Sequence, residues 1–169
     1  MPFAEDRFDA AMAVLTVHHW SNLEAGLSEM RRVAKGRLVI LTFDPESPYF
    51  WLADYIPKII AIDQPIMPKL EAFEQILGPC EVKTVPVPHD CTDGFLGAYW
   101  RRPHAYLDPQ VRASISTFAK LDNIADALAR LEQDLASGDW QARHGHLMEL
   151  DNLDVGYRLV TAQPISKKE

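Results

Sequence analysis

The sequence predicts an α/β fold organised around a parallel strand–helix–strand crossover. Residues 8–17 and 37–43 are apolar runs without polar alternation, the pattern of strands that are covered on both faces. The segment between them has the spacing of an amphipathic helix and short joints to both runs. Such a crossover is right-handed with its strands parallel, and ligands of these sheets bind at the carboxyl ends of the strands, here residues 16–19 and 43–46.

The helix of this crossover carries signals at both ends. Ser21 followed by Glu24 fits a capping box, in which each side chain satisfies a backbone N–H of the first turn. Lys35 and Gly36 fit its last turn, a cation near the final carbonyls followed by a glycine cap. The inward face is predicted to contain Leu23, Leu27, Met30 and Ala34.

The next part of the chain alternates breakers with short periodic segments. Residues 45–68 are rich in proline and aromatic residues, which predicts short helical turns rather than one long helix. A helix is predicted at 69–77, ended by the following glycine. Residues 81–88 form a predicted strand, and Pro86 and Pro88 place it at a sheet edge because proline cannot donate to a ladder.

A group of helices is predicted before the last strand. Asp108 precedes a proline and is expected to cap one helix, and Asp122 is expected to open another that stops at Gly138. A shorter helix is expected at 140–150. A final strand is expected at 156–162, followed by a polar tail that is expected to fray.

Length and composition fit a single domain, 1–169, with a helical insertion at about 92–150. The net charge is −7 and no cluster of Lys and Arg stands out, so we expect no nucleic-acid partner. The longest apolar run, 10–15, is far below the roughly 18 residues of a membrane span, so no membrane is expected. Cys80 and Cys91 belong to no C-x-x-C pair, which favours reduced thiols in a cytoplasmic protein.

Three segments carry a resemblance to a known family. Residues 2–10, 15–20 and 29–36 (PFAEDRFDA, LTVHHW and EMRRVAKG) resemble class I S-adenosylmethionine-dependent methyltransferases, most closely the branch that acts on small molecules. The resemblance is strong over the first 45 residues and looser afterwards. It implies an incomplete Rossmann-like sheet made of the family's strands four to seven, the last of them antiparallel, with inserted helices.

The resemblance also implies a donor-binding region. Leu15, Thr16 and His18 would lie beside S-adenosylmethionine, with His18 nearest the reacting methyl group as a catalytic residue. Phe3 would back the adenine ring. The alternatives are that His18 and His19 only cap a strand end by hydrogen bonding, and that Phe3 is an apolar anchor.

Further candidate residues follow the second and third predicted strands. His89 and Asp90 form a possible base and its orienting carboxylate, and a polar turn explains them equally well. His144 and His146 invite a metal interpretation, but two ligands without a placed carboxylate or Cys make a weak site, so no metal is expected. Four aromatic residues are candidates for the wall of a pocket that binds a small-molecule acceptor: Trp51, Tyr55, Tyr99 and Trp100. The alternative is that they are ordinary core residues.

The family's glycine-rich donor loop is not found in the sequence. The eight glycines contain no G-x-G-x-x-G pattern, which suggests a reading frame begun late or a fragment. The chain is therefore not expected to be competent to bind donor by itself. The alternative function is a non-enzymatic module, derived from the same fold, that binds itself or a partner. We expect residues 10–17 to be an exposed sheet edge through which two copies form a homodimer.

Overall fold

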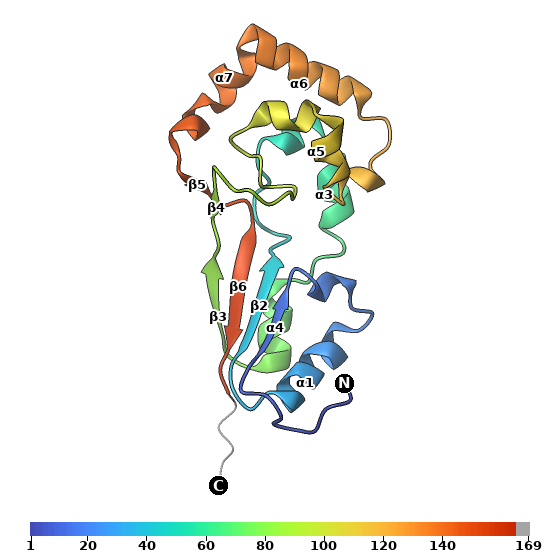
Figure 1. Cartoon of the computed structure of the whole chain (residues 1–169), viewed down its shortest axis with the longest axis vertical. Helices are drawn as coiled ribbons and strands as arrows, with labels where there is room; N and C mark the ends of the chain where they lie inside the picture. Colours follow the sequence, from blue (N-terminus) through green and yellow to red (C-terminus); the bar gives the residue numbers. More distant parts are fainter. Residues whose placement is uncertain (165–169) are drawn as a thin grey trace. The chain divides into compact units, whose positions relative to one another are not determined.

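The computed structural model describes residues 1–164. The chain forms two compact units (Figure 1). Within the described residues, the sheet unit consists of Met1–Glu46, Ile66–Val85 and residues 156–164. The helical unit consists of Ser47–Pro65 and Pro86–Val155. The range 92–150, predicted to be an insertion, falls within the second of these segments, and its being an insertion stays a prediction. From residue 165 on, the tail that was expected to fray lies outside the described residues.

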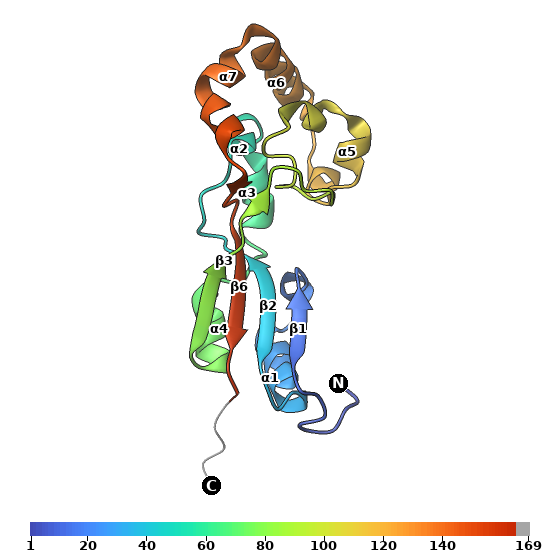
Figure 2. The same ribbon diagram turned by 60° about the vertical axis from the view of Figure 1, so that its left-hand side comes forward.

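The sheet unit contains a four-stranded sheet in the order β1-β2-β6-β3 (Figure 2). β1 (Ala11–Val14) and β2 (Leu38–Phe43) are parallel, which confirms the crossover. β6 (Tyr157–Ala162) runs antiparallel to β2 and to β3 (Cys80–Thr84). The order and the antiparallel last strand confirm the predicted fold class.

Two helices, α1 (Leu23–Val33) and α4 (Leu70–Leu77), cover one face of this sheet, as Figure 2 shows. The central β2 alternates buried and half-buried residues, with its fully buried side chains toward the helices. The predicted inward face of α1 is confirmed, with Leu23 packed at the margin of the core. The core of the sheet unit consists of Ala13, Val17, Leu27, Met30, Ala34, Leu38, Ile40, Phe73, Leu77, Val160 and Ala162.

The start of α1 differs from the prediction. Asn22 is the N-cap, and its Oδ1 accepts a hydrogen bond of 2.9 Å from the N–H of Ala25. The capping box expected from Ser21 and Glu24 is therefore wrong. Asn and Ser are about equally good caps, so the sequence alone could not choose between adjacent positions.

The end of α1 also differs, because the chain begins to pair with the N-terminal segment. Ala34, not Gly36, is the C-cap, and it forms an isolated parallel bridge with Phe8. Extended backbone at Ala34 (φ −112°, ψ 116°) stops the helix there. Gly36 instead allows the backbone of Asp9 to pass close to it, because a Cβ at position 36 would lie 2.0 Å from the carbonyl oxygen of Asp9.

The remaining strand predictions are partly right. β1 is shorter than the predicted run 8–17. The predicted strand 81–88 is divided between β3, at an edge of the main sheet, and β4 (Val87–Pro88), which pairs with β5 (Asn152–Leu153) in a two-stranded ladder. The edge position that the two prolines predicted is confirmed for β3.

Between residues 45 and 68 the structure has two short helices, α2 (Leu52–Tyr55) and α3 (Lys58–Asp63), as the prolines of this segment predicted. Asp108 caps α5 as expected, its side chain accepting from the N–H of Gln110, but α6 begins at Ala125 without a side-chain cap rather than at Asp122. Gly138 ends α6 in the left-handed region (φ 86°). The elements are α2 (Leu52–Tyr55), α3 (Lys58–Asp63), η2 (Pro103–Leu107), α5 (Pro109–Ala113), η3 (Phe118–Lys120), α6 (Ala125–Ser137), α7 (Asp139–His144) and η4 (Gly145–Glu149).

Large aromatic side chains form the core of the helical unit. Trp51 lies edge-on to Trp140 and to Tyr106, with ring centroids 5.3 and 5.5 Å apart. Trp51, Trp100, Tyr106 and Trp140 are at most 4% exposed. Aromatic pairs in this geometry add a favourable electrostatic contribution to their burial. Over residues 1–164, no helix has the length and apolar character that crossing a membrane requires.

Candidate functional site

The chain turns sharply where β1 ends. Leu15 has a positive φ of 46°, yet its N–H still donates to the carbonyl of Leu41 on β2 at 2.9 Å. The 3-10 turn η1 (Val17–His19) follows at once and is anchored by Val17, which is 2% exposed. A left-handed leucine is uncommon and costs roughly 1–2 kcal/mol, so the fold must hold this turn in place. It lies at the carboxyl ends of two parallel strands, where such sheets bind ligands.

Polar groups collect on this turn. The Thr16 hydroxyl makes no capping hydrogen bond to η1, although Thr16 is its N-cap residue. The imidazole rings of His18 and His19 lie against each other, with centroids 3.9 Å apart; His18 is half-buried and His19 exposed. The structure thus brings together three of the four residues that the resemblance assigned to the donor, Leu15, Thr16 and His18.

Phe3, the fourth, lies in the N-terminal segment, which runs along α1. The residue is 46% exposed, and its ring packs edge-on against that of Phe8, with the centroids 5.0 Å apart. Its carbonyl accepts a hydrogen bond of 2.9 Å from Arg32, whose guanidinium also holds Glu29 at 2.6 and 2.9 Å. The hydrogen bonds that Glu29 accepts from Arg32, and next the one from the N-terminal ammonium group, lower the pKa of Glu29 to about 2.

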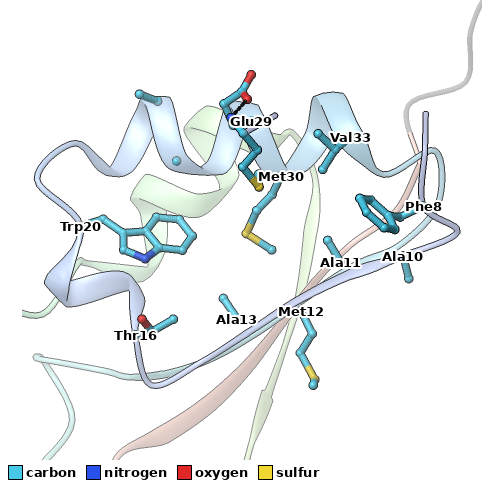
Figure 3. Close-up of a pocket in the computed structure, with 13 residues that line it drawn as sticks. Phe8, Ala10, Ala11, Met12, Ala13, Thr16, Trp20, Glu29, Met30 and Val33 are labelled. Carbon is cyan, nitrogen blue, oxygen red and sulfur yellow. Dashed lines mark hydrogen bonds and ion pairs between the residues drawn. The ribbon is translucent and has the colours of Figure 1, made fainter. Parts of the chain in front are cut away.

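A pocket of about 690 Å³ lies between β1 and α1 (Figure 3). Trp20, Met30 and Phe8 extend into the space between the two elements, whereas Met12 points away from α1. The Trp20 ring packs on Gly26, where a Cβ would lie 2.2 Å from Cε3. The pocket is lined by Met1, Phe8, Ala10, Ala11, Met12, Ala13, Thr16, Trp20, Ala25, Gly26, Glu29, Met30 and Val33. Its lining is mainly apolar, so it suits an apolar group.

At the carboxyl end of β2, Asp44 is held in a partly buried ion pair that sequence reasoning did not single out. Arg158 of β6 approaches Oδ2 of Asp44 at 3.6 Å, and the two side chains are 13% and 15% exposed. The Asp44 N–H donates to the carbonyl of Gly156 at 2.9 Å. The ion pair depends on the antiparallel pairing of β6 with β2, and β6 lies more than 100 residues later in the chain. No local sequence pattern could therefore predict it.

His89, the predicted catalytic base, and Asp90, its predicted orienting carboxylate, lie in the helical unit directly after β4. The His89 N–H donates to the carbonyl of Asp151 at 2.9 Å, which extends the β4–β5 ladder by one residue. The Cys91 N–H donates to the carbonyl of Pro88 at 3.2 Å, which closes a tight turn. His89 is half-buried and Asp90 exposed. These contacts agree with the polar-turn interpretation, and a catalytic role stays a prediction.

The four predicted acceptor residues also belong to the helical unit. The Trp51 Nε1–H donates to the carbonyl of Trp100 at 2.7 Å, and the Trp100 Nε1–H to that of Val87 at 3.0 Å. Trp51, Tyr55 and Trp100 are buried in the aromatic core, whereas Tyr99 is half-buried and stacks with the Arg102 guanidinium at 4.7 Å. Three of the four therefore act as packing residues, and an acceptor wall stays a prediction.

A polar network around Tyr55 escaped the sequence reasoning. The Tyr55 hydroxyl donates to Oδ2 of Asp134 at 2.7 Å and accepts from Arg143 at 2.6 Å. Burial is the main cause that raises the pKa of Tyr55 to about 12. Asp134 and Arg143 also form an ion pair. Tyr55 and Asp134 are 79 positions apart, so only the folded chain reveals the network.

His144 is a packed residue of the aromatic core. Its ring lies near Trp51 and Trp140, at 6.1 and 5.5 Å between centroids, and its Nε2 is 3.7 Å from Oδ2 of Asp54. Burial lowers the pKa of His144 despite the nearby carboxylate. His146 is exposed. Within residues 1–164, no group of three His, Cys, Asp or Glu side chains is arranged to hold a metal ion.

Comparison with known proteins matches the chain both to a family and to solved structures. Residues 1–40 match the family described as "Methyltransferase domain". The structure of a protein of Anabaena variabilis, assigned as a methyltransferase from an antibiotic biosynthesis pathway, is 32% identical with a TM-score of 0.88. The alignment covers 96% of this chain and 69% of that one. No curated protein matches the sequence.

Two other solved structures are more distant. The YcgJ protein of Bacillus subtilis is 15% identical with a TM-score of 0.43, over 95% of this chain and 64% of its own. A protein of Bacillus halodurans, assigned as a methyltransferase, is 13% identical with a TM-score of 0.42, over 95% and 71%. At these scores neither adds to the assignment, which rests on the Anabaena relative together with the family match. This chain belongs to the class I S-adenosylmethionine-dependent methyltransferase family.

Proposed function

We propose that the chain contributes to methyl transfer from S-adenosylmethionine to a small molecule, with the turn after β1 facing the donor. The observation that carries the proposal is the strained turn at Leu15 (φ 46°), held by its hydrogen bond to Leu41 at the carboxyl ends of two parallel strands. The antibiotic pathway of the Anabaena relative supports a small-molecule acceptor.

The residues near the turn fit one side of the donor. Phe3 is 46% exposed and offers an aromatic ring suited to the face of an adenine. Thr16 has a hydroxyl that is not used as a helix cap. The family resemblance assigns the other contacts with the donor to a glycine-rich loop. We therefore expect this chain alone to bind the donor weakly, with a dissociation constant well above the micromolar range.

His18 is the candidate for the proton-handling step. Bound S-adenosylmethionine supplies an electrophilic methyl group, so the main task of the protein is to hold the acceptor in line with it. An acceptor that loses a proton on methylation needs a base, and neutral imidazole suits that role near pH 7. His18 is half-buried on the turn, with the His19 ring against it at 3.9 Å. In this proposal, His18 accepts the proton while His19 restricts its ring.

Equilibrium dialysis with radiolabelled S-adenosylmethionine tests donor binding. We expect weak binding that S-adenosylhomocysteine displaces, and Phe3→Ala should weaken it several-fold. Ile66→Ala, which also truncates an exposed apolar residue (40% exposed), is the matched control and should have no effect. If labelled donor is not retained at millimolar concentration, or if both variants behave alike, the donor proposal fails and the non-enzymatic module becomes the better account.

A further inference from the structure

Asp63, the last residue of α3 in the helical unit, is a carboxylate in an unfavourable position. The carbonyl groups at the C-terminus of a helix carry partial negative charge, so an acidic side chain there is repelled rather than stabilised. Asp63 is also half-buried, and burial raises the pKa of its carboxyl above the ordinary 3.8. Both features disfavour the ionised form, so neither of them accounts for an aspartate at this position.

The neighbours of Asp63 compensate its carboxylate only in part. The two carboxylate oxygens share one donor, the hydroxyl of Thr117, at 3.3 and 3.2 Å. Lys120, the exposed last residue of η3, acts on Asp63 through its charge, but within residues 1–164 no cation forms an ion pair with Asp63. A carboxylate can accept about four hydrogen bonds, so most of this capacity is left for a further donor.

Two further side chains belong to the surroundings of this carboxylate. Thr117 is the N-cap residue of η3, yet its hydroxyl makes no capping hydrogen bond and donates to Asp63 instead. Thr117 is 7% exposed, so its surroundings hold the hydroxyl in place. Burial, and next the charge of Asp63, raise the pKa of the half-buried Tyr49 to about 12, so this phenol stays protonated at neutral pH. A carboxylate with an aromatic ring in its vicinity is a combination that suits an organic cation.

We propose that Asp63, together with Thr117 and Tyr49, binds the ammonium group of a small-molecule amine. The ammonium supplies the positive charge and the hydrogen-bond donors that the carboxylate lacks, and the Tyr49 ring adds a cation–π contribution. The net charge of −7 favours the approach of a cation. Cation binding stands by itself, whereas the step from it to an amine as the methyl acceptor rests on the function proposed above.

Titration of the whole chain with benzylammonium, followed by NMR of the backbone amides, tests the site in the absence of the methyl donor. We expect shifts at Asp63 and Thr117 at millimolar concentration, and none there with benzyl alcohol, which has the same ring without the charge. Asp63→Asn should weaken the binding at least tenfold, whereas Asp126→Asn, at an exposed position of α6, should leave it unchanged. Equal shifts from the amine and the alcohol, or none at these two amides, would overturn the proposal.

Two further measurements separate a binding residue from a structural one. Asp63→Asn removes the unfavourable charge and keeps an oxygen for the Thr117 hydroxyl, so it should raise the melting temperature while it weakens binding. Lys120→Gln removes the competing cation and should tighten the binding of benzylammonium several-fold, but only while Asp63 is present. A lower melting temperature for Asp63→Asn, or no tighter binding by Lys120→Gln, would contradict a ligand-binding role.

The amine titration and the donor-binding experiment fail separately. Binding of benzylammonium without retention of S-adenosylmethionine would keep the cation site and remove methyl transfer as its purpose. Retention of S-adenosylmethionine without binding of benzylammonium would overturn the cation site and leave the donor proposal standing.

Discussion

The phenolic oxygen of Tyr55 donates a hydrogen bond of 2.7 Å to Oδ2 of Asp134, which joins α2 to α6 inside the helical unit. Arg143 of α7 donates to the same phenolic oxygen at 2.6 Å. One hydroxyl thus links α2 to α6 and α7, whose contacting residues lie 79 and 88 positions later in the chain. A buried hydroxyl with two partners of opposite charge is favourable because each partner compensates the desolvation of the other.

Tyr55→Phe should lower the free energy of unfolding by about 1–2 kcal/mol, because it removes both hydrogen bonds and leaves Asp134 and Arg143 with fewer partners. Urea denaturation followed by tryptophan fluorescence measures the change. Tyr99→Phe is the matched control, since the contact of Tyr99 with the Arg102 guanidinium involves the ring. The network would lose its assigned role if both variants were equally stable.

His144 should make stability depend on pH in the acidic range. Burial lowers the pKa of His144 below its ordinary 6.5, so the unfolded chain binds a proton more readily than the folded chain does. The free energy of unfolding should therefore fall as pH drops below about 6.5 and level off once the folded form is also protonated.

A pair of histidine variants isolates this contribution. His144→Gln should flatten the pH dependence of stability between neutral and acidic pH, whereas His104→Gln, at an exposed position on η2, should leave it unchanged. Denaturation curves at several pH values measure both. An unchanged slope in His144→Gln would mean that other groups cause the acid sensitivity.

Gly156→Ala should be strongly destabilising. Gly156 has φ 105°, and a Cβ there would lie 2.5 Å from the Phe43 ring, so the variant combines backbone strain with a steric clash. We expect a loss of more than about 2 kcal/mol, measured by chemical denaturation. Gly138→Ala is the control, since Gly138 also has a positive φ (86°) but no atom within 4 Å of the added Cβ. Its cost should be about 1 kcal/mol, so similar losses in both variants would contradict the assigned clash.

The sequence predicted the sheet unit well because its signals are local. The parallel crossover follows from two apolar runs around an amphipathic helix, and the edge position of β3 follows from the prolines after it. Helix ends were harder. Asn22 and Ser21 are adjacent residues of nearly equal capping strength, so the sequence does not choose between them. Ala34 ends α1 by pairing with Phe8, which is distant in sequence, so no signal near Ala34 predicts this end.

The candidate site was predictable only where one short segment carries it. Leu15, Thr16 and His18 share a single turn, so the resemblance to the family found them together. Tyr55 with Asp134, and Asp44 with Arg158, depend on segments that meet only in the folded chain. The four aromatic residues assigned to an acceptor have no local mark that separates a pocket wall from a core, and three of them are core residues.

The most direct test of the central claim is to map S-adenosylhomocysteine onto the whole chain by NMR at millimolar ligand. The account predicts fast-exchange shifts confined to the sheet unit, largest at the amides of Phe3, Leu15, Thr16 and His18. The same titration of His18→Ala should show smaller shifts at the turn, and that of His146→Ala should match the unmodified chain. Shifts confined to the helical unit, or none at the turn after β1, would contradict the proposal that this turn faces the methyl donor.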